Sequence, residues 1–266
     1  MSTAEVLKER VASNRFRLPS PPDIYLRILE IVQRDGDLQE VEAVLKYDAS
    51  ITARLIQVAN SPALRGSGKV SSALSALTRL GTKFTSSLVL GLSMRDRFSL
   101  KDKELRNIAS SIWERGVYAG AAASILAKEL RPEYRFSPEV SLTAGILHNI
   151  GFLPILDYCS TEGINSSNFK EVSHLAPEVG KLILTTWGMD KNLVDCTSLA
   201  HTIPIALPGE VTYLDLVALV LLARDSLPSE ISKSYGDKVG IDVDGVAILL
   251  SEYTSEISEL MASVGV

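Results

Sequence analysis

The chain has 266 residues, of which 46% are hydrophobic and 22% charged, and its formal net charge is -5. These values exclude intrinsic disorder, which needs low hydrophobicity and high net charge, and they argue against a globally basic nucleic-acid binder. Two cysteines, Cys159 and Cys196, are too few for a disulfide framework and form no CxxC pair, so we expect a reducing compartment.

No targeting or membrane segment is predicted. The first residues carry acidic side chains and lack the apolar core of a signal peptide. The most apolar run, residues 216–223, is much shorter than the ~20 residues that a bilayer span needs. We therefore expect a globular cytoplasmic protein with no membrane partner.

Apolar residues recur at helical spacing along the whole chain, and no segment shows the strict alternation that is typical of a strand. The expected helices cover residues 20–36, 37–45, 48–60, 71–80, 84–92, 103–130, 137–151, 177–186, 190–200, 212–227 and 243–261. Ser20 is predicted to cap the first of them, Asp37 and Glu40 to form a capping box, and Gly81 to end the fourth. The predicted fold class is all-α.

A charge-dense segment, residues 95–103, separates two apolar helical regions. We expect it to join a smaller N-terminal helical lobe, residues 16–94, to a larger helical bundle at residues 103–227. Residues 228–266 would form a C-terminal helical extension. Because no Gly/Ser-rich linker is present, the two lobes are expected to pack together.

The region between Asp48 and Asp96 contains no acidic residue. Its basic residues are Arg54, Arg65, Lys69, Arg79, Lys83 and Arg95. They could present a basic face to an anionic ligand, a nucleic acid or an acidic protein surface. The alternative is a solvated face that pairs with the acidic C-terminal end. Few aromatic residues interleave with these cations, which disfavours nucleic acid as the partner.

His148 lies in an apolar, small-residue helix at residues 141–151 and is followed by Asn149. A His–Asp pair at such a place, with further His and Asp from neighbouring helices, can hold a metal that activates water for phosphoester hydrolysis. Asn149 is uncharged and is a weaker ligand than aspartate. A single histidine in a buried helix is more often a hydrogen-bonded core residue than a metal ligand.

Several motifs resemble the HDOD domain, the HD-related output domain of bacterial signalling proteins. They are LPSPP at residues 18–22, DASITARLIQVANS at 48–61, VSSALSALTRLG at 70–81, Trp113, AGILHNIG at 144–151, EVG at 178–180, WG at 187–188 and LAH at 199–201. The N-terminal motifs are specific, and the later ones follow in the right order. The resemblance covers residues 16–227 and implies an HD-like helical bundle.

The resemblance also implies a degenerate metal site. The metal-binding histidine that comes first in the HD phosphohydrolases falls on Arg115, and their His–Asp pair falls on His148 and Asn149. A later histidine falls on His201, and the final aspartate falls on Arg224 or on the adjacent Asp225.

Fixed guanidinium charges oppose binding of a divalent cation, so the resemblance implies no catalytic residue, no metal and no cofactor. These residues could instead form a cationic cleft that binds phosphate or a nucleotide without hydrolysing it. The alternative is that the arginines pair with Asp157, Asp225 or another carboxylate and only hold helices together.

The first functional hypothesis is therefore a non-enzymatic bacterial regulatory protein, a stand-alone HDOD module that acts through protein–protein contacts in a signalling pathway. Homo-oligomerisation stays open. One alternative is a metal-dependent phosphohydrolase with an atypical ligand set that uses His148 and His201. Another is a nucleic-acid-associated regulator that uses residues 54–95 and binds with strong salt dependence.

Overall fold

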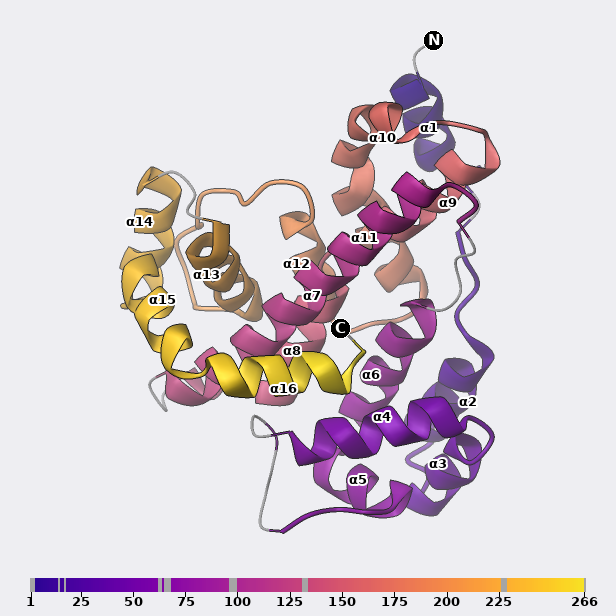
Figure 1. Cartoon of the computed structure of the whole chain (residues 1–266), viewed down its shortest axis with the longest axis vertical. Helices are drawn as coiled ribbons and strands as arrows, with labels where there is room; N and C mark the ends of the chain where they lie inside the picture. Colours follow the sequence, from indigo (N-terminus) through magenta and orange to yellow (C-terminus); the bar gives the residue numbers. More distant parts are fainter. Residues whose placement is uncertain are drawn as a thin grey trace.

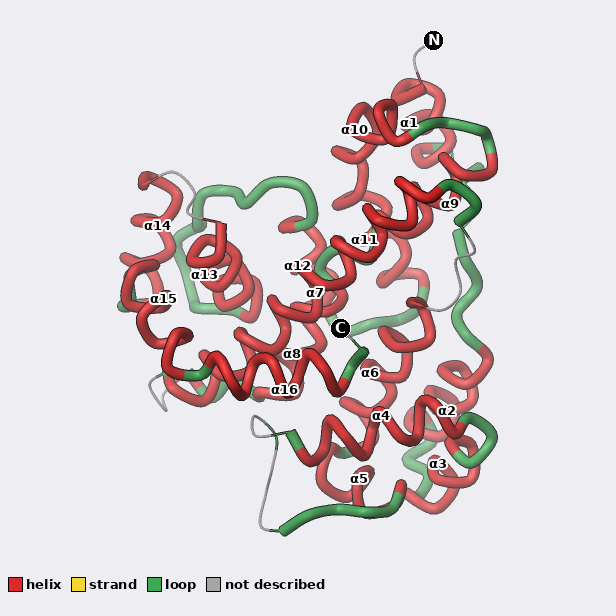
Figure 2. Tube along the Cα trace, viewed as in Figure 1, coloured by secondary structure: helices red, strands yellow, loops and turns green. Residues whose placement is uncertain are grey.

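The computed structural model describes residues 3–13, 15–16, 18–61, 64, 68–95, 100–130, 134–225 and 229–265. Over these ranges the chain forms helices joined by turns and loops, and no strand (Figure 2). The predicted all-α class is confirmed. The long helix crosses the middle of the molecule, and the last helix runs across it toward a small lobe formed early in the chain (Figure 1).

Short amphipathic helices build the N-terminal lobe (Figure 1). They are α2 (Asp23–Gln33), α3 (Leu38–Leu45), α4 (Ala49–Asn60) and α5 (Ala73–Leu80). The predicted capping box is confirmed, because Asp37 accepts from the Glu40 N–H while the Glu40 carboxylate accepts from the Asp37 N–H. Gly81 ends α5 with a φ of 76°, as expected. The expected Ser20 cap is wrong: α2 begins after Pro22, which stays extended, and no side chain caps it.

The connection between the lobes runs through α6 (Thr82–Arg95), which contacts α2 on one side and α8 (Pro138–Leu147) on the other. Part of the predicted charged linker, residues 96–99, lies outside the described residues. After it, the Arg106 guanidinium donates to the carbonyls of Leu100 and Lys101 at 2.7 and 2.6 Å. The end of the connection is therefore fastened to the following helix.

The larger lobe is built on α7 (Lys103–Glu129), whose second half is buried against α8. Small residues allow this close approach: a Cβ atom on Gly145 would lie 2.1 Å from the Gly120 nitrogen. The helix α13 (Tyr213–Asp225) packs on both, and its residues 216–222 are fully buried, as predicted for this apolar run. The remaining elements are α9 (Phe152–Thr161), α10 (Ser166–Val172), η2 (Ser173–Leu175), α11 (Ala176–Thr186), α12 (Lys191–Cys196) and η3 (Thr197–Leu199).

One stretch, Pro138–Thr161, is long and apolar enough to cross a membrane by composition alone. However, 83% of its most apolar window is buried inside the structure. A turn at residues 148–151 divides it into α8 and α9. The stretch is therefore part of the protein core.

The C-terminal region forms α14 (Ser229–Val239), α15 (Val243–Glu252) and α16 (Thr254–Ser263). The single helix predicted for residues 243–261 is wrong, because the chain bends at Tyr253, where the Thr254 hydroxyl donates to the Ser251 carbonyl at 2.9 Å. The bend lets α15 pack on α13 while α16 crosses α7 and reaches α4 (Figure 1). An N-terminal helix that was not predicted, α1 (Thr3–Ala12), packs on α10.

Candidate functional site

His148 directly follows α8 and is fully buried. Its Nδ1 lies 2.6 Å from the Gly145 carbonyl oxygen. Because a carbonyl oxygen only accepts, Nδ1 carries the proton and Nε2 keeps its lone pair. Burial, with a smaller contribution from the Arg115 charge, lowers the His148 pKa from 6.5 to about 4. The imidazole is therefore neutral at physiological pH, with an Nε2 that is buried and has no hydrogen-bond partner among the described residues.

Asn149 fastens the end of α8 to α7. Its Nδ2 donates to the Ile112 carbonyl at 2.6 Å. Gly116 makes room for the amide, since a Cβ atom there would lie 3.1 Å from the Asn149 Oδ1. An ionised aspartate at this position could only accept, so it could not make the bond to Ile112. The amide thus has a structural role that a metal-binding carboxylate could not fulfil.

Arg115 and Asp225 form an ion pair beside His148. Arg115 projects from α7 and Asp225 from the last turn of α13, and their side chains are 32% and 27% exposed. Both charges act on His148, where Arg115 lowers the pKa and Asp225 raises it. Of the carboxylates considered from the sequence, Asp225 is the one that pairs with Arg115. The pair connects α7 to α13 and neutralises the guanidinium.

Arg224 points elsewhere. Its guanidinium lies 4.5 Å from the centre of the Tyr118 ring and 3.8 Å from the Glu114 carboxylate. Successive residues of a helix point about 100° apart, so Arg224 and Asp225 cannot face the same place. Of the two residues left open by the sequence, the structure brings Asp225 to His148. The Tyr118 and Glu114 contacts could not be found from a sequence motif.

His201 is not bonded to this cluster in the part of the chain that the structure describes. It follows η3 and is exposed, whereas His148 is fully buried. No hydrogen bond or ion pair in the described residues joins it to Arg115, His148 or Asp225. The structure therefore brings together Arg115, His148 and Asn149 with Asp225, whereas Arg224 contacts Tyr118 and Glu114.

The cluster does not fit a divalent metal. No group of three or more His, Cys, Asp or Glu residues suited to a metal occurs among the described residues. The Asp225 carboxylate that would serve as a ligand is already bonded to a guanidinium. The cavity that Asn149 lines has a volume of about 10 Å³, which is room for no more than one water molecule. Arg115, His148 and Asp225 do not line this cavity, so the phosphate or nucleotide site expected from the sequence stays a prediction.

The residues of the predicted basic face have different surroundings. Arg79 donates to the carbonyls of Ala59 and Gly68 at 3.0 and 2.8 Å, which holds the connection between α4 and α5. Lys69 lines a groove together with Glu259 of the acidic helix α16. Arg54 is half-buried on α4. Arg65 lies outside the described residues, as do the side chains of Lys83 and Arg95.

The buried His148 predicts a specific pH dependence of stability. Because its pKa falls from 6.5 to about 4 on folding, the unfolded chain binds a proton in this interval and the folded protein does not. This contribution to the free energy of unfolding is complete above the unfolded pKa and falls by about 3 kcal/mol as the pH drops to the folded pKa. Urea unfolding across the interval measures it. His148→Gln should flatten the profile; equal slopes in both proteins would contradict a neutral buried imidazole.

The family and the fold are shown by comparison with known proteins. A family model for the HDOD domain matches residues 18–203. A Shewanella amazonensis protein, provisionally named a metal-dependent phosphohydrolase, has a TM-score of 0.84 at 22% identity, with 98% of this chain and 97% of that chain covered. An HDOD domain protein of unknown function from Geobacter sulfurreducens has a TM-score of 0.61 at 20% identity, with coverages of 98% and 97%.

A third solved structure comes from Marinobacter aquaeolei and is provisionally named a signal transduction protein. Its TM-score is 0.60 at 20% identity, and the alignment covers 97% of this chain and 60% of that one. No curated protein matches the chain. At such identities the solved structures show the shared helical fold alone. The match to the family model extends over most of the sequence, and the chain belongs to the HDOD family.

Proposed function

We propose that this chain is a non-enzymatic regulatory module that acts through contacts with other proteins in a bacterial signalling pathway. Membership of the HDOD family supports a regulatory role, as does the name of the Marinobacter aquaeolei protein. Two buried thiols without a disulfide, Cys159 and Cys196, fit the reducing cytoplasm in which we place it.

The observation that carries the non-enzymatic part is the Arg115–Asp225 ion pair beside neutral His148. Metal-dependent phosphoester hydrolysis needs a cation that polarises the phosphate and lowers the pKa of a bound water. Here a cation would have to displace the guanidinium from Asp225 and then remain near its positive charge. The only other polar group at the turn, the Asn149 amide, is already used to bond α7.

Metal content and hydrolysis together test this proposal. Protein purified without an affinity tag should contain far less than one equivalent of iron, manganese or zinc by elemental mass spectrometry. It should not hydrolyse p-nitrophenyl phosphate or its diester when Mn²⁺ is added. The matched control is His148→Gln, which removes the one imidazole of the cluster. Near-stoichiometric metal that is lost in this variant, together with hydrolysis, would contradict the proposal and favour a phosphohydrolase.

A further inference from the structure

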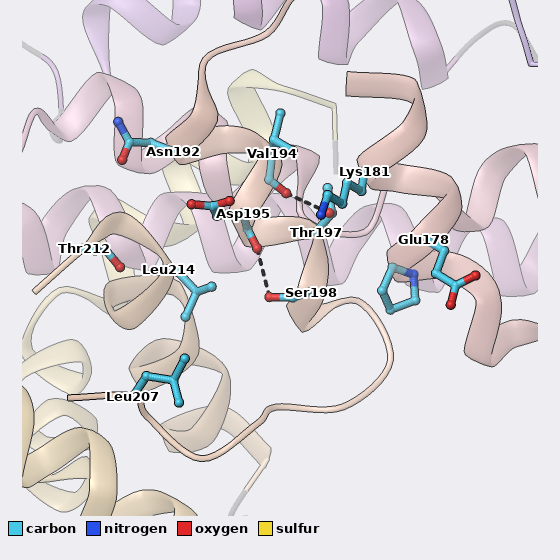
Figure 3. A pocket seen from close by; sticks show the side chains of 11 residues that line it. Glu178, Lys181, Asn192, Val194, Asp195, Thr197, Ser198, Leu207, Thr212 and Leu214 are labelled. Carbon is cyan, nitrogen blue, oxygen red and sulfur yellow. Dashed lines mark hydrogen bonds between the residues drawn. The ribbon is translucent and has the colours of Figure 1, made fainter. Parts of the chain in front are cut away.

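A cleft of about 400 Å³ lies between α11, the α12–η3 segment and residues 207–214. Its size is within the range of about 300–1,000 Å³ that is typical of binding pockets. Figure 3 shows Glu178 and Lys181 on the α11 side, Leu207 and Leu214 on the opposite side, and Asp195 and Ser198 between them. The cleft therefore combines an apolar wall with a charged wall.

The loop that forms the apolar wall is held in place at several points. Ile203 is buried, and the Ala206 N–H donates to the Ser234 hydroxyl of α14 at 3.0 Å. At the end of the loop, the N–H and hydroxyl of Thr212 donate to the Asp215 carboxylate at 2.7 and 2.9 Å. Because these contacts fix the backbone, the apolar side chains between them have defined positions.

Two of these side chains face solvent: Ile205 is 54% exposed and Leu207 is 77% exposed. They lie close in sequence to two anchored residues, the buried Ile203 and the hydrogen-bonded Ala206. Leu207 lines the cleft, whereas Ile205, two residues earlier in the same loop, does not. Apolar side chains that a fixed loop keeps exposed beside a cleft are typical of protein interaction sites.

The charged wall offers two groups that are free to pair with a ligand. Glu178 and Lys181 are one turn apart on the exposed face of α11. No hydrogen bond or ion pair joins either of them to another residue within the described ranges. In contrast, Asp195 is bonded to Lys191. The cleft thus presents one available anion and one available cation opposite an apolar surface.

We propose that this cleft and the loop beside it bind a segment of a partner protein whose apolar anchor is flanked by one acidic and one basic residue. The anchor packs against Leu207 and Leu214, while the flanking charges pair with Lys181 and Glu178. A small molecule confined to the cleft would leave Ile205 uncovered, whereas a peptide that continues along the loop from Leu207 covers it. The inference rests on the proposed function, because it names the surface through which protein contacts are made.

A phage-displayed library of random dodecapeptides, selected on the full chain, tests the proposal. The enriched peptides should share an apolar residue between an acidic and a basic one. In fluorescence anisotropy, Leu207→Ser and Lys181→Glu should each weaken binding of the synthetic peptides by at least about tenfold. Ile248→Ser is the matched control, since Ile248 is 66% exposed on α15 and does not line the cleft. The affinity of Ile248→Ser for the peptides should equal that of the wild type.

Three outcomes would overturn the proposal. The first is that no peptide with this pattern is enriched. The second is that the selected peptides bind Leu207→Ser as tightly as the wild type. They would then bind elsewhere, for example at the exposed Leu26 and Tyr47 on the N-terminal lobe, and the proposed function would still stand. The third is that the wild type dimerises in sedimentation experiments and Leu207→Ser does not, because the occupant would then be a second copy. Metal-dependent hydrolysis would instead contradict the proposed function itself.

Discussion

Gly145→Ala is expected to destabilise the folded protein by about 3 kcal/mol or more, which is the upper end of the usual cost of overpacking. A Cβ atom at this position would lie 2.1 Å from the Gly120 nitrogen and 2.2 Å from its Cα. Both atoms belong to the backbone of α7 and cannot rotate away. The helices would have to separate along the crossing that forms the centre of the larger lobe.

Gly91→Ala is the matched control for this substitution. Its new Cβ would meet only side-chain atoms, the closest being the Ile146 Cγ2 at 3.1 Å, and these can shift. Alanine also favours a helix by about 1 kcal/mol over glycine, so the net change should be small. Urea unfolding followed by circular dichroism measures both variants. Similar stabilities for the two would show that α7 and α8 do not approach as closely as the structure has them.

The α7–α8 crossing matters for function because it sets the positions of His148 and Asn149. The turn that follows α8 places the Asn149 amide on the Ile112 carbonyl of α7 and leaves His148 buried beside Arg115. A separation of the helices would therefore disturb the cluster as well as the fold. For this reason Gly145→Ala is not a suitable probe of binding. The substitutions of exposed cleft residues, Leu207→Ser and Lys181→Glu, are suitable probes.

The fold could be predicted where its determinants are local. The Asp37–Glu40 capping box and the end of α5 at Gly81 each depend on residues within one helical turn. In contrast, α14 has few apolar residues and was missed. One of its attachments, the ion pair between Lys238 and Asp215, joins positions that are far apart in the sequence. The bend at Tyr253 was missed for a similar reason, because it serves contacts of α15 and α16 with distant helices.

The candidate site, too, could be predicted only where its determinants are local in the sequence. The sequence motif identified His148, Asn149 and Arg115, because these lie in runs with a recognisable order. The motif could not choose between Arg224 and Asp225. Neighbouring residues of a helix point about 100° apart, and only the packing of α13 on α7 decides which of the two side chains faces inward. The cleft beside α11 was not predicted. The available signal was the apolar sequence between Pro204 and Pro208, but exposure of Ile205 and Leu207 is visible only in the fold.

Removal of the ion pair between Lys238 and Asp215 is expected to destabilise the folded protein about as strongly as Gly145→Ala. The Lys238 nitrogen lies 2.8 Å from the Asp215 carboxylate, and the two side chains are only 13% and 1% exposed. Lys238→Met keeps the length of the side chain and removes its charge, which leaves the buried carboxylate without a counter-ion. Loss of one partner of a buried pair costs about 3–5 kcal/mol, so we expect a destabilisation of this size.

Two further variants separate the charge effect from general damage to α14. Lys233→Met, at an exposed position of the same helix, should change the free energy of unfolding by about 0.5 kcal/mol or less. Combining Lys238→Met with Asp215→Asn should recover part of the loss, because the buried charge is then absent. If the double variant is no more stable than Lys238→Met alone, the pair is not the cause. The Asp215 carboxylate also accepts from Thr212, and α14 accepts from Ala206, and these two bonds anchor the loop that forms the apolar wall of the cleft. Lys238→Met should therefore also weaken peptide binding, although Lys238 does not line the cleft.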